Sequence, residues 1–140
     1  MSLYTDEVKK RANSSPYYHL LGMEVIDLKD GWARIDMNFK NGLTQFYGAV
    51  HGGAIASLLD SSVAIALLSL CEPGDRVTTI EMKINYLHPV NEPIRGEGKI
   101  IHKGSRIAVG EADAKTTEGK LVAKALVTYM IKKNPLESLP

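Results

Sequence analysis

The stretch "HGGAIASLLDSSVAIALLSL", residues 51–70, decides the fold of this 140-residue chain. It opens with a histidine and two glycines, and from Ala54 onward it is apolar apart from serines and one acid, Asp60. The run is only about as long as the shortest membrane span, and its polar residues interrupt it. We therefore expect a buried helix over about residues 52–70, apolar on almost all sides.

Strands are predicted on both sides of this helix. The segment "WARIDMNF", residues 32–39, alternates apolar and polar side chains, as a half-buried strand does. Asp30-Gly31 just before it is typical of a two-residue hairpin turn, which makes residues 23–29 the partner strand. A further strand is expected over residues 80–86, and three more follow Pro93, separated by turns at residues 103–105 and 117–119.

The middle of these last three strands has a face with almost no side chain. Ala108, Gly110, Ala112 and Ala114 alternate with larger residues, so the central helix can approach this face closely. An N-terminal helix is expected over about residues 4–13, where acids precede bases. Strands joined by tight turns pair antiparallel, so the sequence predicts an α+β fold: one domain, residues 1–140, with five or six antiparallel strands wrapped around one long helix.

Composition narrows the function classes. Seventeen basic and 16 acidic residues give a formal net charge of +1, which favours neither nucleic acid nor a membrane surface. The single cysteine has no internal disulfide partner and no nearby ligands at metal-binding spacing, so we expect no metal site. The first residues lack the apolar core of a signal peptide, and a cytoplasmic location is expected.

Asp60 requires an explanation, because an ionised carboxylate in apolar surroundings costs several kcal/mol unless it is paired. With about 100° between residues, Ser57, Asp60 and Ser61 form one narrow polar stripe on the helix. The carboxylate could be structural, bonded to these serines or paired across an interface. It could also be catalytic, because perturbed acids gather at active sites. Both interpretations stay open on the residues alone.

His51 and Asp60 cannot share a site within one helix. Nine residues correspond to a rise of about 13.5 Å and a rotation of about 900°, which places them on opposite sides. His51 is most simply a helix cap, and Gly52 and Gly53 allow close packing at the helix start. The first N–H groups of a helix are also unpaired and lie at the positive end of its dipole, so they can stabilise an oxyanion.

The segment "GAVHGGAIASLLDSSVAIA", with Gln45 before it and "TTIEMKINYLHPV" after it, resembles hotdog-fold acyl-CoA thioesterases of the phenylacetate-degradation (PaaI-like) type. The resemblance implies a curled antiparallel sheet around a central helix, and two subunits whose sheets run on continuously with active sites at the interface. Gly52 would polarise the thioester carbonyl, and Asp60 of the other subunit would be nucleophile or general base. Gln45 would contribute to the carbonyl or water site. His51 would help to position the thioester, and Thr79 would orient the water.

The same resemblance assigns the turn "HKGSRIA" to coenzyme A. Lys103 and Arg106 would meet phosphate groups, and Gly104 and Ser105 would offer backbone and hydroxyl donors. An ordinary charged hairpin turn is an equally good interpretation of each residue. The pocket walls are expected to include Leu43, Phe46, Tyr47 and Leu59, which fits an apolar or aromatic acyl group.

The sequence therefore predicts hydrolysis of an acyl-CoA thioester to a free acid and CoA, without metal or cofactor, coenzyme A being part of the substrate. A homodimer with shared sites is expected, and a tetramer is possible within the family. The alternative is a non-catalytic acyl-CoA or acyl-carrier binding protein on the same fold. A hotdog dehydratase fits least well, because His51 and Asp60 are not placed together for proton transfer at carbon.

Overall fold

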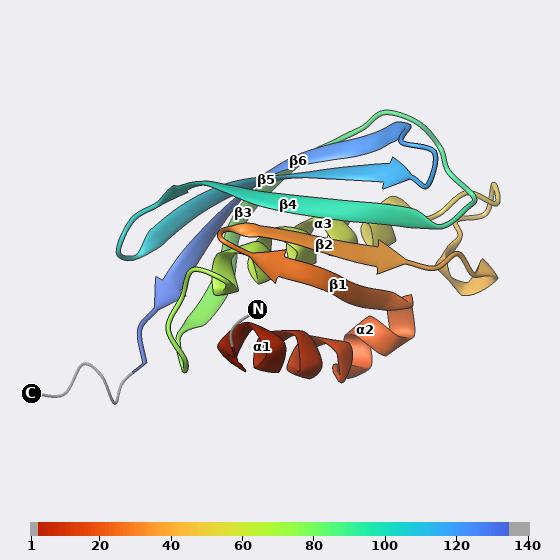
Figure 1. The fold of residues 1–140 in the computed structure, drawn as a ribbon. Coiled ribbons are helices and arrows are strands. Elements are labelled where there is room, and N and C mark those ends of the chain that lie inside the picture. Colours follow the sequence, from red (N-terminus) through yellow and green to blue (C-terminus); the bar gives the residue numbers. More distant parts are fainter. Residues whose placement is uncertain (1–2, 135–140) are drawn as a thin grey trace, which may run out of the picture.

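The structure is a computed structural model that describes residues 3–134. Its helices are α1 (Leu3–Asn13), α2 (Pro16–Leu21) and α3 (Gly52–Leu68), with a short 3-10 turn, η1 (Asn41–Leu43). Its strands are β1 (Met23–Lys29), β2 (Trp32–Met37), β3 (Arg76–Tyr86), β4 (Ile94–Lys103), β5 (Ile107–Thr116) and β6 (Leu121–Lys132). Figure 1 shows the sheet curling over α3, with α1 and α2 on the side away from the sheet.

The six strands form one antiparallel sheet in the order β1-β2-β4-β5-β6-β3, which confirms the predicted α+β hotdog fold. The hairpin between β1 and β2 turns at Asp30 and Gly31, which have φ of 50° and 82°, as such a turn requires. The second strand ends at Met37, two residues before the predicted end. The central helix ends at Leu68, also two residues early. The fold is thus the predicted one, and these two elements end two residues earlier than predicted.

The closest contact between α3 and the sheet lies at the glycines of β4. A Cβ on Gly98 would overlap the Ser62 carbonyl, and one on Gly96 would overlap the Ser62 hydroxyl. On β5 the predicted small-residue face also meets the helix, since a Cβ on Gly110 would lie 2.5 Å from Val63 Cγ1. The expected close approach is confirmed, and β4 shares it with β5.

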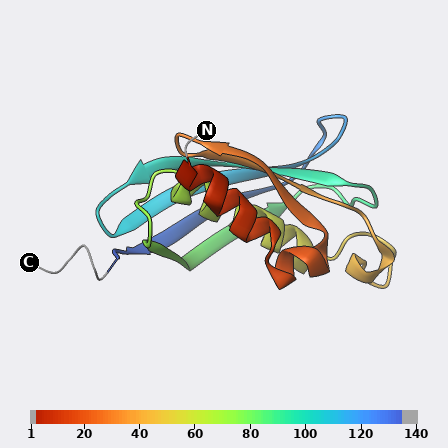
Figure 2. The same ribbon diagram turned by 60° about the horizontal axis from the view of Figure 1, so that its bottom comes forward.

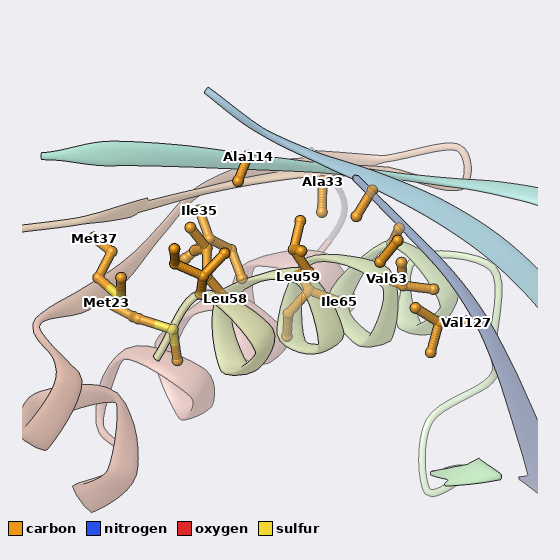
Figure 3. Close-up of a cluster of buried hydrophobic side chains, with 14 of the residues drawn as sticks. Met23, Ala33, Ile35, Met37, Leu58, Leu59, Val63, Ile65, Ala114 and Val127 are labelled. Atoms are coloured by element: carbon orange, nitrogen blue, oxygen red, sulfur yellow. The ribbon is translucent and has the colours of Figure 1, made fainter. Parts of the chain in front are cut away.

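The hydrophobic core fills the space between α3 and the curved sheet (Figure 3). Leu58, Leu59 and Val63 of α3 are fully buried there. They pack into one cluster with buried residues of the strands, among them Ala33, Ile35, Met37, Ala114 and Val127. Burial on nearly every side explains why the helix is apolar almost all round. No helix within residues 3–134 is long and apolar enough to cross a membrane.

The N-terminal helices cover the open side of α3, as Figure 2 shows. Helix α1 matches the predicted span, and its Asn13 side chain holds the main chain of Val25 on β1: the amide nitrogen donates to the Val25 carbonyl, and Oδ1 accepts from the Val25 N–H. Helix α2 was not predicted. It begins with Pro16 at its first turn and ends at Gly22, whose φ of 71° is left-handed.

Strand β3 is an edge of the sheet and begins at Arg76, four residues before the prediction. It pairs with β6 along its inner side, with a bulge between Thr79 and Glu81. Its outer edge has no partner strand among the described residues. The exposed Ile80 and Tyr86 lie along this edge strand.

Candidate active site

The start of α3 leaves one N–H group free. His51 is the N-cap, with φ −60° and ψ 136°, and its Nδ1 accepts the Gly53 N–H at 2.7 Å. The N–H groups of Ala54 and Ile55 donate to the His51 carbonyl at 2.9 Å and 3.3 Å. Only the N–H of Gly52 has no acceptor within residues 3–134. The positive end of the helix therefore offers a single unused donor, the one predicted for an oxyanion.

Tyr86 covers the other side of Gly52. A Cβ on Gly52 would lie 3.2 Å from the Tyr86 ring, and the Tyr86 hydroxyl donates to the Gly52 carbonyl at 2.9 Å. Burial against the helix start raises the pKa of Tyr86. This contact links the first residue of α3 to the last residue of β3 and holds the free N–H in place.

Gln45 lies beside the same helix start. Its Oε1 accepts the Tyr47 N–H at 2.5 Å, and its own N–H donates to Ala49 at 2.9 Å, so the loop before α3 is folded on itself. Gln45 and Gly52 line one pocket of about 320 Å³, together with Tyr86. A second hollow of about 660 Å³ is lined by Gln45 and His51. The structure thus brings together Gln45, His51 and Gly52.

Asp60 is held by hydroxyl groups from two paired strands. Thr79 of β3 donates to Asp60 Oδ1 at 2.8 Å. Tyr129 of β6 lies opposite Thr79 in the sheet, and its hydroxyl donates to the same Oδ1 and, at 2.6 Å, to the Asp60 carbonyl. Oδ2 accepts no hydrogen bond from residues 3–134. One carboxylate oxygen is therefore fixed and the other is left open to a reacting group.

The hydroxyl of Tyr129 remains a donor across the physiological pH range. The side chain is 2% exposed, and burial followed by its hydrogen bond to Asp60 raises its pKa well above the ordinary value of 10. A phenol that stays protonated can hold an ionised carboxylate without competing for its charge. Tyr129 is thus suited to orient Asp60.

The free N–H and the acid do not meet within one subunit. Eight residues of helix separate Gly52 from Asp60, a rise of about 12 Å. Gly52 contacts Tyr86, at the far end of β3, whereas Asp60 contacts Thr79, near its beginning. The two halves of the predicted site lie apart, as helix geometry requires.

The turn between β4 and β5 stands away from both groups. Lys103, Ser105 and Arg106 are exposed, and the Gly104 N–H donates to the Ile107 carbonyl at 2.8 Å. Within residues 3–134 no hydrogen bond or ion pair connects this turn with Asp60 or Gly52. The Arg106 carbonyl accepts from Ile131 of β6, which places the turn at the end of the sheet where β3 begins.

Two leucines predicted for the pocket walls lie in the hydrophobic core. Leu59 is fully buried and Leu43 is 7% exposed, so both are core residues. For Leu59, the sequence pattern did not reveal this burial, because α3 is apolar and buried on nearly every side. Phe46 and Tyr47 are instead almost fully exposed, with their rings 5.1 Å apart, and they line the hollow next to His51.

Three tyrosines at the site escaped the sequence prediction. Tyr129 contacts Asp60, Tyr86 contacts Gly52, and Tyr17 hydrogen-bonds Ser57 of α3 at 2.7 Å. Tyr129 had one recognisable signal, since it is the hydroxyl-bearing residue among apolar neighbours on the inner face of its strand. Its partner is 69 residues away in sequence, so only the folded sheet identifies the contact.

Residues 47–123 match the model of the thioesterase superfamily. The chain belongs to the thioesterase superfamily. This confirms the predicted family and enzyme class, a thioester hydrolase. Among residues 3–134, no group of three or more His, Cys, Asp or Glu side chains could hold a metal ion.

Individual relatives agree with this assignment. A proposed esterase of Saccharolobus solfataricus is 34% identical over 95% of this chain and 94% of its own. Acyl-coenzyme A thioesterase 13 of Mus musculus is 32% identical over 64% of this chain and 65% of its own. The crystal structure of a thioesterase family protein from Silicibacter pomeroyi is 28% identical, with a TM-score of 0.85 over 91% of this chain and 97% of its own.

A solved structure of a protein related to phenylacetic acid degradation has the same fold. A phenylacetic acid degradation-related protein of Ralstonia eutropha shares the fold with a TM-score of 0.81, covering 91% of this chain and 98% of its own at 22% identity. The predicted hotdog architecture is therefore found in solved structures over almost the whole described chain.

Proposed function

We propose that this thioester hydrolase acts on acyl-CoA, using Gly52 of one subunit and Asp60 of another. The free Gly52 N–H at the positive end of α3 is the observation that carries the proposal. An N–H without an acceptor stabilises a carbonyl oxygen that becomes negative in the transition state. The name of the mouse relative, an acyl-coenzyme A thioesterase, supports the choice of coenzyme A.

The open Oδ2 of Asp60 would supply the other half of the reaction. As a general base it takes a proton from water, whose oxygen bonds to the carbonyl carbon. The C–S bond then breaks, and the CoA thiolate leaves and takes up a proton. As a nucleophile, Oδ2 would bond to that carbon first, and water would then release the acid. Thr79 and Tyr129 hold Oδ1 in either route, so the same residues serve both.

The open edge of β3 supports a shared site. Edge strands present unpaired N–H and C=O groups that readily pair with another chain. If two β3 strands pair antiparallel about their midpoint, Glu81, then Arg76 lies opposite the partner subunit's Tyr86. Asp60 is bonded near the start of β3, and Gly52 touches its end. This pairing would therefore bring Asp60 toward the partner subunit's Gly52 in two equivalent places.

The exposed turn of residues 103–106 would bind the phosphate groups of coenzyme A. Lys103 and Arg106 provide two cations, and Ser105 provides a hydroxyl, all reachable by solvent. Arginine and lysine are the usual partners of phosphate. Gln45 and His51 would complete the thioester side, since they lie with Gly52 at the start of α3.

Two single variants prepare a test of the shared site. Asp60→Asn removes the base and should lower kcat by about 10²–10⁴-fold. Gly52→Pro removes the N–H and adds a ring: proline is tolerated at the first helical position, and His51 already has the extended backbone that proline favours before it. Loss of one oxyanion donor should lower kcat by about 10²–10³-fold. Gly52→Ala keeps the N–H while adding the Cβ, and it is the matched control.

The decisive measurement mixes the two defective chains. Co-expressed with different tags, Asp60→Asn and Gly52→Pro should form mixed dimers in which one site has both native groups. With random assembly, activity toward acyl-CoA should return to roughly a quarter of the wild-type value. A mixture of Asp60→Asn with Asp60→Ala should recover nothing. Isolated mixed dimers without recovered activity would refute the shared site, and a wild-type protein that binds but never hydrolyses acyl-CoA would favour the binding-protein alternative.

A further inference from the structure

A groove of about 700 Å³ lies between α1, α3 and β3, and we call it the α1 groove. Figure 2 shows α1 crossing α3, with β3 at the lower edge of the molecule. The apolar residues that line the groove come from four elements: Val8, Ala12, Tyr18, Ile65, Leu68 and Val77. A concave space of this size that combines apolar and polar lining is typical of sites for small organic groups.

Three of the four charged residues that line the α1 groove are exposed. Glu7, Arg11 and Arg76 line the groove and are exposed, so their charged ends are free to remain in water. Asp75 also lines it, but its carboxylate oxygens are already taken by hydrogen bonds. Ile65 is 4% exposed, and Leu68 and Val77 are packed against the core. The floor of the groove is thus suited to an apolar group.

The residues that line the α1 groove share faces of β3 and α3 with the groups around Asp60. On β3, Val77 and Thr79 lie on the same face, because side chains two apart share a face of a strand, and Thr79 binds Asp60. On α3, Ile65 follows Ser61 by one turn, so the two share a face of the helix. Tyr18 connects these places: it lines the groove, hydrogen-bonds Ser61 and feels the charge of Asp60. Of α3, Ile65 and Leu68 line the groove, and Leu68 lies about 12 Å along the helix from Asp60.

The outer wall of the α1 groove is fixed to the sheet. Asn13 holds both the N–H and the carbonyl of Val25, and the Lys9 ammonium donates to the Ile26 carbonyl at 3.0 Å. Helix α1 is thereby attached to β1, so it can serve as a wall of constant position. A rigid wall can exclude groups that are too long or too wide.

We propose that the α1 groove binds the acyl group of the substrate and that α1 sets the chain length the enzyme accepts. The inference rests on the proposed function, because a thioester carbon within reach of Asp60 Oδ2 leaves its acyl chain at the mouth of this groove. The space along α3 fits an apolar acyl chain of medium length. The CoA part of the bound substrate extends from the same carbon in the opposite direction, toward the start of the partner subunit's α3.

Ala12 is the position at which to narrow the groove. It lies on α1, lines the groove and is partly buried, so a phenylalanine there would occupy the space that the chain needs. Lys10→Phe is the matched control, because Lys10 is exposed on the same helix and does not line the groove, so this variant places the same ring outside it. Leu68→Ala tests the opposite direction by enlarging the floor.

The experiment measures kcat/KM for acetyl-, hexanoyl- and decanoyl-CoA. In Ala12→Phe, we expect the value for decanoyl-CoA to fall by about tenfold or more while that for acetyl-CoA stays unchanged. Leu68→Ala should raise the ratio of kcat/KM for decanoyl-CoA to that for hexanoyl-CoA. Lys10→Phe should have the wild-type kcat/KM for all three substrates. An Ala12→Phe profile parallel to the wild-type profile would overturn the inference, and so would equal losses for all three chains, even if the protein remained a thioesterase.

Binding separates this inference from the proposed chemistry. Decyl-CoA and ethyl-CoA thioethers cannot be hydrolysed, so their affinities report the groove even in a protein that turns nothing over. We expect Ala12→Phe to weaken decyl-CoA by about tenfold and to leave ethyl-CoA unchanged in calorimetric titrations. If Asp60→Asn loses hydrolysis but keeps the wild-type affinities for decyl-CoA and ethyl-CoA, the groove binds the acyl group independently of the chemistry at Asp60. Equal decyl-CoA affinity in wild type and Ala12→Phe would overturn the acyl assignment.

Discussion

Asp60 and Asp75 are two aspartates in apolar surroundings that the protein treats in opposite ways. Both oxygens of Asp75 are occupied: Oδ1 accepts the Asn134 N–H at 3.0 Å, and Oδ2 accepts the Glu72 N–H at 3.0 Å and the Lys133 ammonium at 3.2 Å. Its side chain is fully buried. We call such a carboxylate saturated, because each of its oxygens already accepts at least one hydrogen bond.

Asp60 shows the contrasting pattern. Two hydroxyl groups converge on its Oδ1, while Oδ2 accepts nothing from the described residues. Fixing one oxygen sets the direction of the other, which is the arrangement a reacting carboxylate needs. Counting donors on each oxygen thus distinguishes a structural acid from a candidate catalyst better than burial does.

The largest expected effect separates the two acids by activity. Asp60→Asn should lower kcat toward acyl-CoA by about 10²–10⁴-fold, whereas Asp75→Asn should leave it within about twofold, because only the first removes a group that reacts. Steady-state hydrolysis by both purified variants, after circular dichroism has verified their folds, makes the measurement. A similar loss in both would mean that saturation of the oxygens does not separate the roles.

A smaller effect is expected from the hydroxyls that orient Asp60. Tyr129→Phe keeps the buried ring and Thr79→Val keeps the shape, and each removes one donor to Oδ1. Each should lower kcat by about tenfold with little change in KM, since a hydrogen bond to a charged group contributes about 1.5–3 kcal/mol. Because both donors serve one oxygen, the double variant should lose less than the product of the two effects.

Thr79→Ser is the matched control, since it restores the hydroxyl without the methyl group. Near-wild-type kcat in this variant, together with a loss in Thr79→Val, would assign the effect to the hydrogen bond. If instead Thr79→Ser and Thr79→Val were equally impaired, packing at β3 rather than orientation of Asp60 would explain the loss.

Much of the fold was predictable because its signals are local. The apolar run with its glycines predicted α3 within two residues at its end, and turn residues predicted the first hairpin and the last three strands. Helix α2 has only six residues and depends on contacts such as Tyr17 with Ser57, so no periodic pattern announces it. The first residues of β3 likewise become strand through pairing with β6, which is distant in sequence.

The candidate site divides in the same way. Helix geometry alone separated His51 and Gly52 from Asp60, and the structure keeps Gly52 and Asp60 apart. The partners of those groups could not be predicted, because Tyr86 and Tyr129 reach them only through the folding of the sheet around α3. The candidate groups were thus predictable from the sequence, whereas the residues that contact them are identified only by tertiary contacts.

The smallest expected effect is on stability and belongs to Asp75. Burial alone would raise the pKa of Asp75, but hydrogen bonds from Glu72, Asn134 and Lys133 outweigh it and lower the pKa below its ordinary value of 3.8. A lowered carboxyl pKa stabilises the fold fully above the unfolded value and loses this stabilisation as pH falls through the folded value. Asp75→Asn should therefore reduce the free energy of unfolding by about 2 kcal/mol at neutral pH.

The pH dependence and a surface control decide whether saturation is the cause. The difference between wild type and Asp75→Asn should stay constant from about pH 8 to about pH 5 and shrink below about pH 4, as protonation removes the charge from the wild-type carboxylate too. Asp113 pairs with Lys124 at 2.9 Å but is partly exposed, so Asp113→Asn should change stability by only about 0.5 kcal/mol. Urea unfolding across this pH range measures both, and equal losses in the two variants would show that the buried hydrogen bonds of Asp75 add nothing beyond an ordinary ion pair.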